Sequence, residues 1–377
     1  MLRFFPLRFA LSLALVLALP LGPAPAMAAE PTVWQAQYPL APDHPVVTEG
    51  WAAMAAALKP DIDLQLRLTG PRLGTAESLD ALSLGAHQMA PVALASYPDD
   101  FPHWAMLGEL FLVGGESVAA AAAISELVMR ECPACQQNFA RRKLVFLGTY
   151  GAAPYRLIGP RPLAASQSLE GQTVATPGSL WDRLVVSLGG RAAPPREDTG
   201  AALVAGKVTA VIDIAAALRR PPLAGHALAV TKLPLGGYRG AGPFMVNRDA
   251  WRSLSVDQRR RAFVAAATGI VRITAAYHRQ DAAALAAARK QGIAVVRGEL
   301  LLEDRIRRFA TADQEQVAKS AEQRFGIANA PHFLDRLKVL YDKYAILLGP
   351  KATDDDAIAL LSAEIFDRLD AETYGLQ

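Results

Sequence analysis

Residues Ser168–Trp181 read SLEGQTVATPGSLW and contain, in order, an extended run, a Pro-Gly turn and the first residues of a helix. Similar extended runs recur along the chain as KLVFLGTYG, KVTAVID and PFMVN, with helical stretches between them. This alternation predicts helices packed on mainly parallel or mixed β-sheets. In such folds, ligands bind in crevices at the ends of strands.

Segments on both sides of this region continue the pattern. Val47, Trp51, Met54 and Leu58 fall on one helical face, and DLQLRLTG then alternates leucines with the period of a strand. TAESLDALSLG predicts a helix from about Thr75 that stops at Gly85, and the apolar segment MAPVALAS follows it.

The chain becomes mostly helical after Asn247. Residues 248–292 and 301–347 predict almost continuous helix, interrupted by GIAVVRGE. A last helix is predicted in ATDDDAIALLSAEIFDRLDAE. Its three consecutive acids could indicate a cation site, but acids in a first turn after a Thr353 cap are what the helix dipole favours.

The N-terminal segment has the features of a secretory signal peptide. Arg3 and Arg8 precede an apolar run, and Ala26-Met27-Ala28 offers small residues for cleavage. The alternative is a membrane anchor, but Gly22 and Pro23 interrupt the run short of the roughly 20 residues that span a bilayer. We therefore predict cleavage after Ala28 and a periplasmic location.

Composition limits the classes of function. The chain has 377 residues, 52% of them hydrophobic, which is enough for two packed domains. Its 39 basic and 36 acidic residues nearly balance, more closely still without the two arginines of the leader. This balance carries no electrostatic footprint for nucleic acid or for an anionic membrane surface.

Cys132 and Cys135 are the only cysteines. An exported protein meets oxidising conditions, so a short structural disulfide at the end of a helix is the first interpretation. Redox catalysis is the alternative; it would place the pair at the start of a helix that follows a strand, whereas here a helix is predicted before it. Two thiolates alone make a poor zinc site.

Sequence signatures of catalysis are scarce. The chain has no G-x-S-x-G, no H-E-x-x-H and no P-loop, and its six histidines lack metal-ligand spacing. The glycine-rich LGGYRGAG, residues 235–242, lacks the order of a phosphate loop and is expected to be a hinge or a loop at the edge of a cleft. We expect no catalysis, no cofactor and no resident metal, although a site assembled from distant residues would leave no motif.

Five motifs, in this order and spacing, resemble those of one known family. They are APDHPVVTEGWAAMAAAL, LTGPRLGTAESLDALSLGAHQM, SLEGQTVATPG, AALVAGKVTAVID and FMVNRDAWRSLSVDQRR. The family is the extracytoplasmic solute-binding proteins of tripartite ATP-independent periplasmic (TRAP) transporters, and the resemblance spans roughly residues 32–296.

The resemblance implies an α/β, two-domain periplasmic solute-binding fold with hinge strands, a long connecting helix and a helical C-terminal region. It also implies closure over a small solute and delivery to the membrane permease subunits of a TRAP transporter. The predicted organisation is a signal peptide (1–28), domain I (29–150, with a returning segment at about 231–250), domain II (151–230), connecting and packing helices (251–349) and a C-terminal helical extension (350–377).

Two positions depart from the family pattern. Ala175 stands where the resemblance implies an arginine that grips a solute carboxylate, and Asp213 stands near an expected asparagine. Both differences make the site more negative, so we do not expect a simple dicarboxylate. The hypothesis is that Asp213 contacts a neutral polar solute, a cation or a complexed metal. The alternative is that Asp213 is solvated or salt-bridged and that Arg156 grips an acid.

Four further residues are candidate contacts by their position. Gln37 and Tyr38 follow the first strand at the end where such folds bind, although an exposed loop aromatic is equally expected there. Trp181 could wall the site or be buried with Leu184. Tyr238 could close over the solute or cap the hinge.

We therefore predict a periplasmic solute receptor. The rivals are a receptor that serves a sensor or another type of transporter, a secreted α/β enzyme, and a structural protein of the envelope that has no solute-sized cleft. Whether the C-terminal extension packs on the body or mediates dimerisation is left open.

Overall fold

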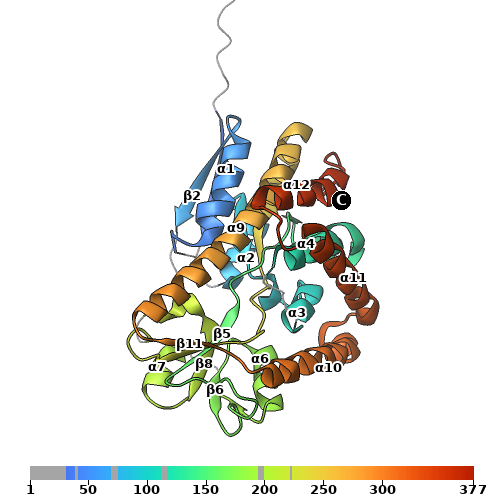
Figure 1. Cartoon of the computed structure of the whole chain (residues 1–377). Helices are drawn as coiled ribbons and strands as arrows, with labels where there is room; N and C mark the ends of the chain where they lie inside the picture. Colours follow the sequence, from blue (N-terminus) through green and yellow to red (C-terminus); the bar gives the residue numbers. More distant parts are fainter. Residues whose placement is uncertain (1–30, 39–40, 69–74, 112–116, 194–198, 221–222) are drawn as a thin grey trace, which may run out of the picture.

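The computed structural model describes residues 31–38, 41–68, 75–111, 117–193, 199–220 and 223–377. The predicted signal peptide therefore lies outside the described residues. The strands form two separate sheets, each covered by helices, with the long helix α9 running between them (Figure 1). The predicted α/β fold with a helical C-terminal region is confirmed.

The first sheet has the strand order β2-β1-β3-β10-β4. Strands β1 and β2 are parallel, as are β1 and β3, whereas β10 runs antiparallel to both of its neighbours. We call this sheet and the helices packed on it the first lobe. Its strands are β1 (Thr32–Tyr38), β2 (Ile62–Leu68), β3 (Met89–Val92), β4 (Leu144–Phe146) and β10 (Gly242–Asn247).

The second sheet has the order β11-β9-β5-β8-β6-β7 and, with its helices, forms the second lobe. Strand β5 is antiparallel to β8 and β9, and the other pairs are parallel. Its strands are β5 (Tyr155–Gly159), β6 (Thr173–Ala175), β7 (Arg191–Ala192), β8 (Ala210–Ile214), β9 (Ala229–Lys232) and β11 (Ala294–Arg297).

Some of the helices begin or end at residues that the capping rules favour. Ser255 and Thr353 form capping boxes with Gln258 and Asp356, and Gly326 ends α10 in the left-handed conformation. The α-helices are α1 (Ala52–Leu58), α2 (Thr75–Ser83), α3 (Pro102–Gly108), α4 (Val118–Glu126), α5 (Pro133–Arg141), α6 (Ser179–Ser187), α7 (Thr199–Val204), α8 (Arg248–Ser253), α9 (Val256–Lys290), α10 (Leu300–Phe325), α11 (Ala330–Leu348) and α12 (Asp354–Glu364). Shorter helical turns are η1 (Val46–Trp51), η3 (Leu94–Ser96), η4 (Leu127–Glu131), η5 (Ala215–Arg219) and η6 (Phe366–Arg368).

Two helices belong to the cores of both lobes. The part of α9 around Ile273 is buried in the first core, and Leu285 near its end is buried in one of the two hydrophobic clusters of the second lobe. In α10, Leu302 and Ile306 are buried in the other cluster of the second lobe, which we call the second core, whereas Val317 is buried in the first core. Full burial of a side chain of this size contributes roughly 1.5–3 kcal/mol, so both helices fix the lobes to each other.

Two connecting segments also run between the sheets. Residues 147–154 lead from β4 to β5, and residues 233–241, which include the glycine-rich loop, lead from β9 to β10. The two segments touch through a β-bridge between Pro154 and Gly237. Within the described residues, no helix has both the length and the apolar character needed to cross a membrane.

The C-terminal extension packs on the body of the first lobe. Leu361, Ile365 and Phe366 are buried in its core, and the Trp251 indole donates a hydrogen bond to the Tyr374 carbonyl at 2.8 Å. The guanidinium of Arg259 donates to the Ala371 carbonyl at 3.1 Å. Trp251 is itself fully buried.

Candidate functional site

A cavity of about 400 Å³ lies between the two sheets, beside the connecting segments. The first lobe contributes the end of β3 and part of α2, and the second lobe contributes the start of β5 and the end of β8. The connecting segments and α9 complete the wall. The lining residues are His44, Ser78, Leu79, Pro91, Val92, Ala93, Tyr97, Tyr150, Ala152, Ala153, Tyr155, Asp213, Ile214, Tyr238, Ala241 and Tyr277.

The pairing of β5 with β8 places a tyrosine and an acid together at this cavity. Tyr155 opens β5 and lies opposite Ile214, so it is diagonal to Asp213 near the end of β8. Burial raises the pKa of the Tyr155 hydroxyl, and the charge of Asp213 raises it further. The phenol is therefore a neutral hydrogen-bonding group at physiological pH.

Asp213 is reachable from the cavity and only weakly paired. Its Oδ1 accepts the backbone N–H of Ile214 at 2.7 Å, and its Oδ2 lies 3.5 Å from Nη2 of Arg220, whose side chain is 65% exposed. Burial raises the pKa of the carboxyl above its ordinary value, against the opposing effects of Ile214 and Arg220. Asp213 thus lines the cavity with one carboxylate oxygen held by the Ile214 N–H and the other in a loose ion pair with Arg220.

A histidine and two tyrosines form a connected group in the wall of the same cavity. The His44 ring lies 2.8 Å from the Tyr277 hydroxyl, and the Tyr277 and Tyr150 rings stack with centroids 5.7 Å apart. Burial lowers the pKa of His44 to about 4, so the imidazole is neutral at physiological pH. Its Nδ1 accepts the backbone N–H of Val46, and therefore Nε2 carries the proton and donates it to Tyr277.

The charge of the cavity is negative. Asp213 is the only acid among the described lining residues, and none of these residues is lysine or arginine. The other titratable groups are neutral, because burial raises the pKa of Tyr150 and raises that of Tyr238 to about 12. A ligand in this cavity meets one carboxylate and several aromatic rings.

A second, smaller cavity of about 160 Å³ adjoins the first, and Tyr155 and Tyr238 line both. Trp181 lines this second cavity, donates to the Leu235 carbonyl at 3.0 Å and lies edge-on to Tyr155. Arg239 also lies in this wall and donates to the carbonyls of Gly237 and Leu110. The second cavity thus holds a cation that the first lacks among its described lining residues.

The structure brings together some of the predicted site residues and separates others. Asp213 and Tyr238 line the main cavity, and Trp181 lines the adjoining one, where it is also buried against Leu184. Ala175 is buried in the second lobe beside Val211 and lines neither cavity.

Three predicted residues lie elsewhere or outside the description. Arg156 forms a buried ion pair with Asp281 of α9 at 2.6 Å and lines neither cavity. Gln37 lies in β1, opposite Arg67 of β2, and also lines neither. The backbone of Tyr38 ends β1, but its side chain lies outside the described part of the chain.

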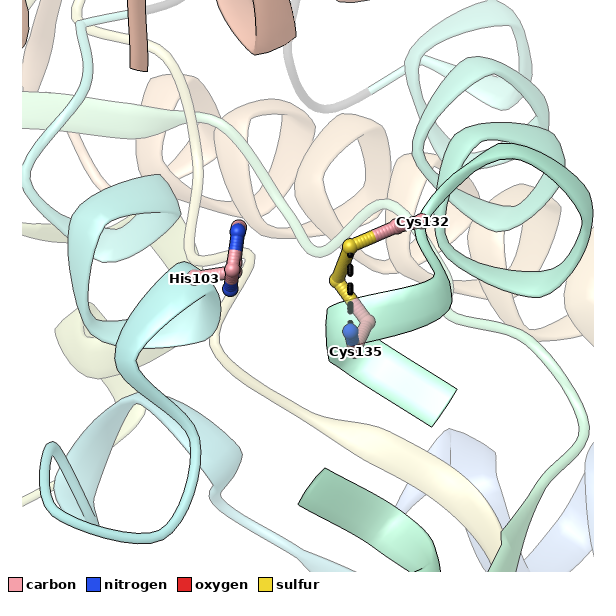
Figure 2. Close-up of side chains that lie close together, drawn as sticks. All are labelled: His103, Cys132 and Cys135. Atoms are coloured by element: carbon pink, nitrogen blue, oxygen red, sulfur yellow. Dashed lines mark hydrogen bonds between the residues drawn. A yellow bond between two sulfur atoms is a disulfide. The ribbon is translucent and has the colours of Figure 1, made fainter. Parts of the chain in front are cut away.

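The predicted disulfide between Cys132 and Cys135 is confirmed. It joins the end of one helical segment to the start of α5, a helix that is not among those predicted, and the Cys135 N–H donates to Cys132 Sγ at 3.1 Å. His103 faces the disulfide, with a ring nitrogen within 4.8 Å of both sulfurs (Figure 2). Because both sulfurs form the S–S bond, this group contains no thiolate that could bind a metal.

Comparison with solved structures identifies the fold. A TRAP periplasmic solute-binding protein from Bordetella bronchiseptica, with bound (R)- and (S)-mandelate, matches with a TM-score of 0.65 and 19% identity over 83% of this chain and 99% of its own. The chain has the fold of the TRAP solute-binding proteins. An open form of such a protein from Desulfovibrio salexigens matches with a TM-score of 0.70 and 18% identity, over 83% of this chain and 96% of its own.

The TRAP solute-binding fold also includes a protein whose ligand is not an aromatic acid. The periplasmic ectoine-binding protein of a Halomonas elongata TRAP transporter matches with a TM-score of 0.64 and 12% identity, over 82% of this chain and 99% of its own. No protein-family model matches the sequence, and no curated protein does.

Proposed function

We propose that the chain is a periplasmic solute receptor that closes its two lobes around a small molecule and delivers it to the permease subunits of a TRAP-type secondary transporter. The observation that carries the proposal is the cavity of about 400 Å³ between the two sheets, in a chain with the TRAP solute-binding fold. Its volume lies within the range of small-molecule sites, and its position beside the connecting segments suits a site that lobe movement opens and closes.

The chemistry of the cavity supports binding without catalysis. At the cavity wall, the Tyr277 hydroxyl lies 2.8 Å from His44, a possible base. His44 donates in this pair because its Nδ1 already accepts the Val46 N–H, so it does not take a proton from the hydroxyl. We infer that the receptor has no reaction of its own and that the predicted leader directs it to the periplasm.

The solute is not a simple dicarboxylate. A dianion would meet the Asp213 carboxylate in a cavity whose described lining offers no lysine or arginine. Like charges at this range repel strongly in a poorly solvated site. Mandelate, which the Bordetella bronchiseptica protein holds, is itself an acid, so the two sites are expected to differ in charge.

A thermal-shift screen of residues 29–377 against polar solutes tests the proposal. A solute at 100 times its dissociation constant adds about 2.7 kcal/mol to the free energy of unfolding, which is readily detected. Ala241→Phe fills the cavity and should abolish the shift, whereas Ala86→Phe, at an exposed position, should leave it unchanged. A library of amines, acids, sugars and polyols that produces no shift would contradict the receptor function.

A further inference from the structure

The carboxylate of Asp213 needs a cationic partner that the protein only partly supplies. The Arg220 guanidinium, at 3.5 Å and with its side chain 65% exposed, lies beyond good hydrogen-bond distance and in contact with solvent. The Asp213 side chain is itself 25% exposed, so a ligand can reach it. A carboxylate placed in a half-buried wall without a close counter-charge is costly unless a ligand provides one.

Aromatic rings surround the same space. Tyr97, Tyr150, Tyr155, Tyr238 and Tyr277 all line the cavity, and they come from different elements of both lobes and from the segments between them. Tyrosine faces carry negative electrostatic potential and attract ammonium groups within about 6 Å of the ring centroid. Such rings attract a cation regardless of whether it has an N–H to donate.

We propose that the solute is a small organic cation whose ammonium group pairs with Asp213 and lies against the tyrosine rings of the cavity. This inference rests on the proposed receptor function and names its ligand class. A monocation neutralises the cavity, and its hydrocarbon part fits the apolar wall formed by Leu79, Pro91 and Val92. A neutral polar solute would leave the Asp213 carboxylate with only the loose, exposed contact to Arg220, and an anion would add a second negative charge beside it.

Arg239 is the group that would favour an anionic solute instead of a cationic one. It lies in the wall of the adjoining cavity, close enough for its charge to lower the pKa of Tyr155, and it is buried. Its guanidinium is already engaged by the carbonyls of Gly237 and Leu110. A carboxylate would have to enter the smaller cavity, past Tyr155 and Tyr238, to reach it.

Isothermal titration calorimetry on residues 29–377 at pH 7.5 tests the ligand class with three matched sets of probes. The first set contains tetramethylammonium, choline, benzylamine and putrescine. The second contains neutral compounds of similar shape, such as benzyl alcohol, and the third contains carboxylates such as benzoate and succinate. We expect the tightest binding within the ammonium set, with a dissociation constant at least tenfold below that of the neutral counterpart.

Asp213→Asn should weaken binding of the best ammonium probe at least tenfold. The amide oxygen can still accept the Ile214 N–H, so the fold is expected to survive. Asp257→Asn removes the same charge from a side chain that is 81% exposed and outside the cavity, and should leave binding unchanged.

The titrations of the wild-type protein decide the chemical class of the ligand even if the Asp213 variant does not fold. Tightest binding by a carboxylate or by a neutral compound overturns the cationic ligand class and leaves the receptor function standing. Equal binding to wild-type protein and to folded Asp213→Asn also overturns it. Failure of every probe, together with a silent screen of the wider library, overturns the receptor function and this inference with it.

Discussion

Tyr155 and Arg156 illustrate how two successive side chains of one strand can take different roles. Arg156 is paired with Asp213 in the strand register, yet its guanidinium turns to Asp281 on α9 and ties the second sheet to that helix. Tyr155, one residue earlier, faces the cavity instead. The polar wall of the site therefore depends on the face of β5 that each side chain takes.

The raised pKa of Asp213 predicts a pH dependence for cation binding. The ionised carboxylate binds the ligand, so affinity should be constant at neutral pH and fall as the pH drops through a value above the ordinary 3.8 of aspartate. The charged and titratable groups that interact with Asp213 are Arg220 and Tyr155, and His44 and Tyr277 line the same cavity. Calorimetry between pH 7.5 and 4.5 should show the fall.

His44 also gains a proton as the pH falls and repels a cation, so the Asp213→Asn variant separates the two contributions. The part of the pH dependence that belongs to Asp213 disappears in that variant. An unchanged profile would assign the whole effect to His44.

His44 predicts a loss of stability in acid. Its pKa is about 4 in the folded chain and 6.5 when unfolded, so the unfolded chain binds more protons between these values and the free energy of unfolding falls as the pH drops from 6.5 to about 4. His44→Gln should reduce this slope by at most about 1.4 kcal/mol per pH unit. Urea unfolding at several pH values measures it.

Burial also lowers the pKa values of His87 and His103. Both histidines therefore still contribute to the pH dependence of the free energy of unfolding in the His44 variant. A slope identical to that of the wild type would show that His44 is not held neutral. The exposed His332, changed to Gln, is the matched control.

At the residue scale, the sequence identifies only part of the site. Asp213 could be selected because it departs from a motif, and Tyr238 because it lies in a glycine-rich loop. Tyr97, Tyr150, Tyr155 and Tyr277 carry no motif and are spread over both lobes, so only the folded chain brings them together. Arg156 and Tyr155 could not be told apart because a shift of one residue exchanges the faces of a strand.

At the scale of elements, ion pairs centred on α6 fix the second lobe to the rest of the chain. Arg183 of α6 donates to Asp313 of α10 at 2.6 Å and to Glu109, after α3, at 2.5 Å. Burial of Glu109 opposes its ionisation, yet hydrogen bonds from Ser179 and Arg183 outweigh that effect and hold its pKa below the ordinary value. Three separate helical regions thus meet at one guanidinium.

Arg183→Ala should lower the free energy of unfolding by about 2–3 kcal/mol, because it leaves the Asp313 carboxylate, only 5% exposed, without its partner. Arg183→Lys keeps the charge but cannot bridge both acids with a planar fork. Its free energy of unfolding should therefore lie between those of the wild type and of Arg183→Ala. Urea unfolding measures all three proteins. If the alanine variant loses less than about 0.5 kcal/mol of the free energy of unfolding, these ion pairs are no stronger than exposed surface pairs.

The disulfide predicts a modest contribution to stability. It closes a loop of only a few residues, since its sequence separation is 3, so the chain-entropy model gives about 2 kcal/mol. The double variant Cys132→Ala/Cys135→Ala should lose about that much in urea unfolding. Solute affinity should not change, because neither cysteine lines the main cavity. A changed affinity would indicate that the disulfide acts on the site.

Most elements could be predicted from local patterns, and the exceptions have a physical cause. The leucine alternation of β2, the Thr353 cap of α12 and the break in the helices at GIAVVRGE all agree with the structure, and the break contains strand β11. Helix α5 was missed because Pro133 and the cysteines indicate a helix end, whereas Pro133 in fact occupies the first turn of a new helix. Domain boundaries remain a prediction.

At the scale of the whole molecule, the C-terminal extension is part of the first lobe. Phe366 is 1% exposed, and Phe366→Ala should lower the free energy of unfolding by about 3–5 kcal/mol. Leu347→Ala, at a side chain 52% exposed, is the control and should change it by less than about 0.5 kcal/mol. Thermal and urea unfolding measure both. Equal stability of the two variants would mean that the extension is not integral to the core.

The shared helices also constrain when this chain can fold. The second core needs Leu302 and Ile306 of α10, and the first needs Phe366, close to the last residue. Neither core is a continuous piece of chain, so a growing polypeptide on the ribosome cannot finish the first lobe before it begins the second. The second core therefore becomes available for packing only after this part of α10 has been synthesised, and the first core only after Phe366.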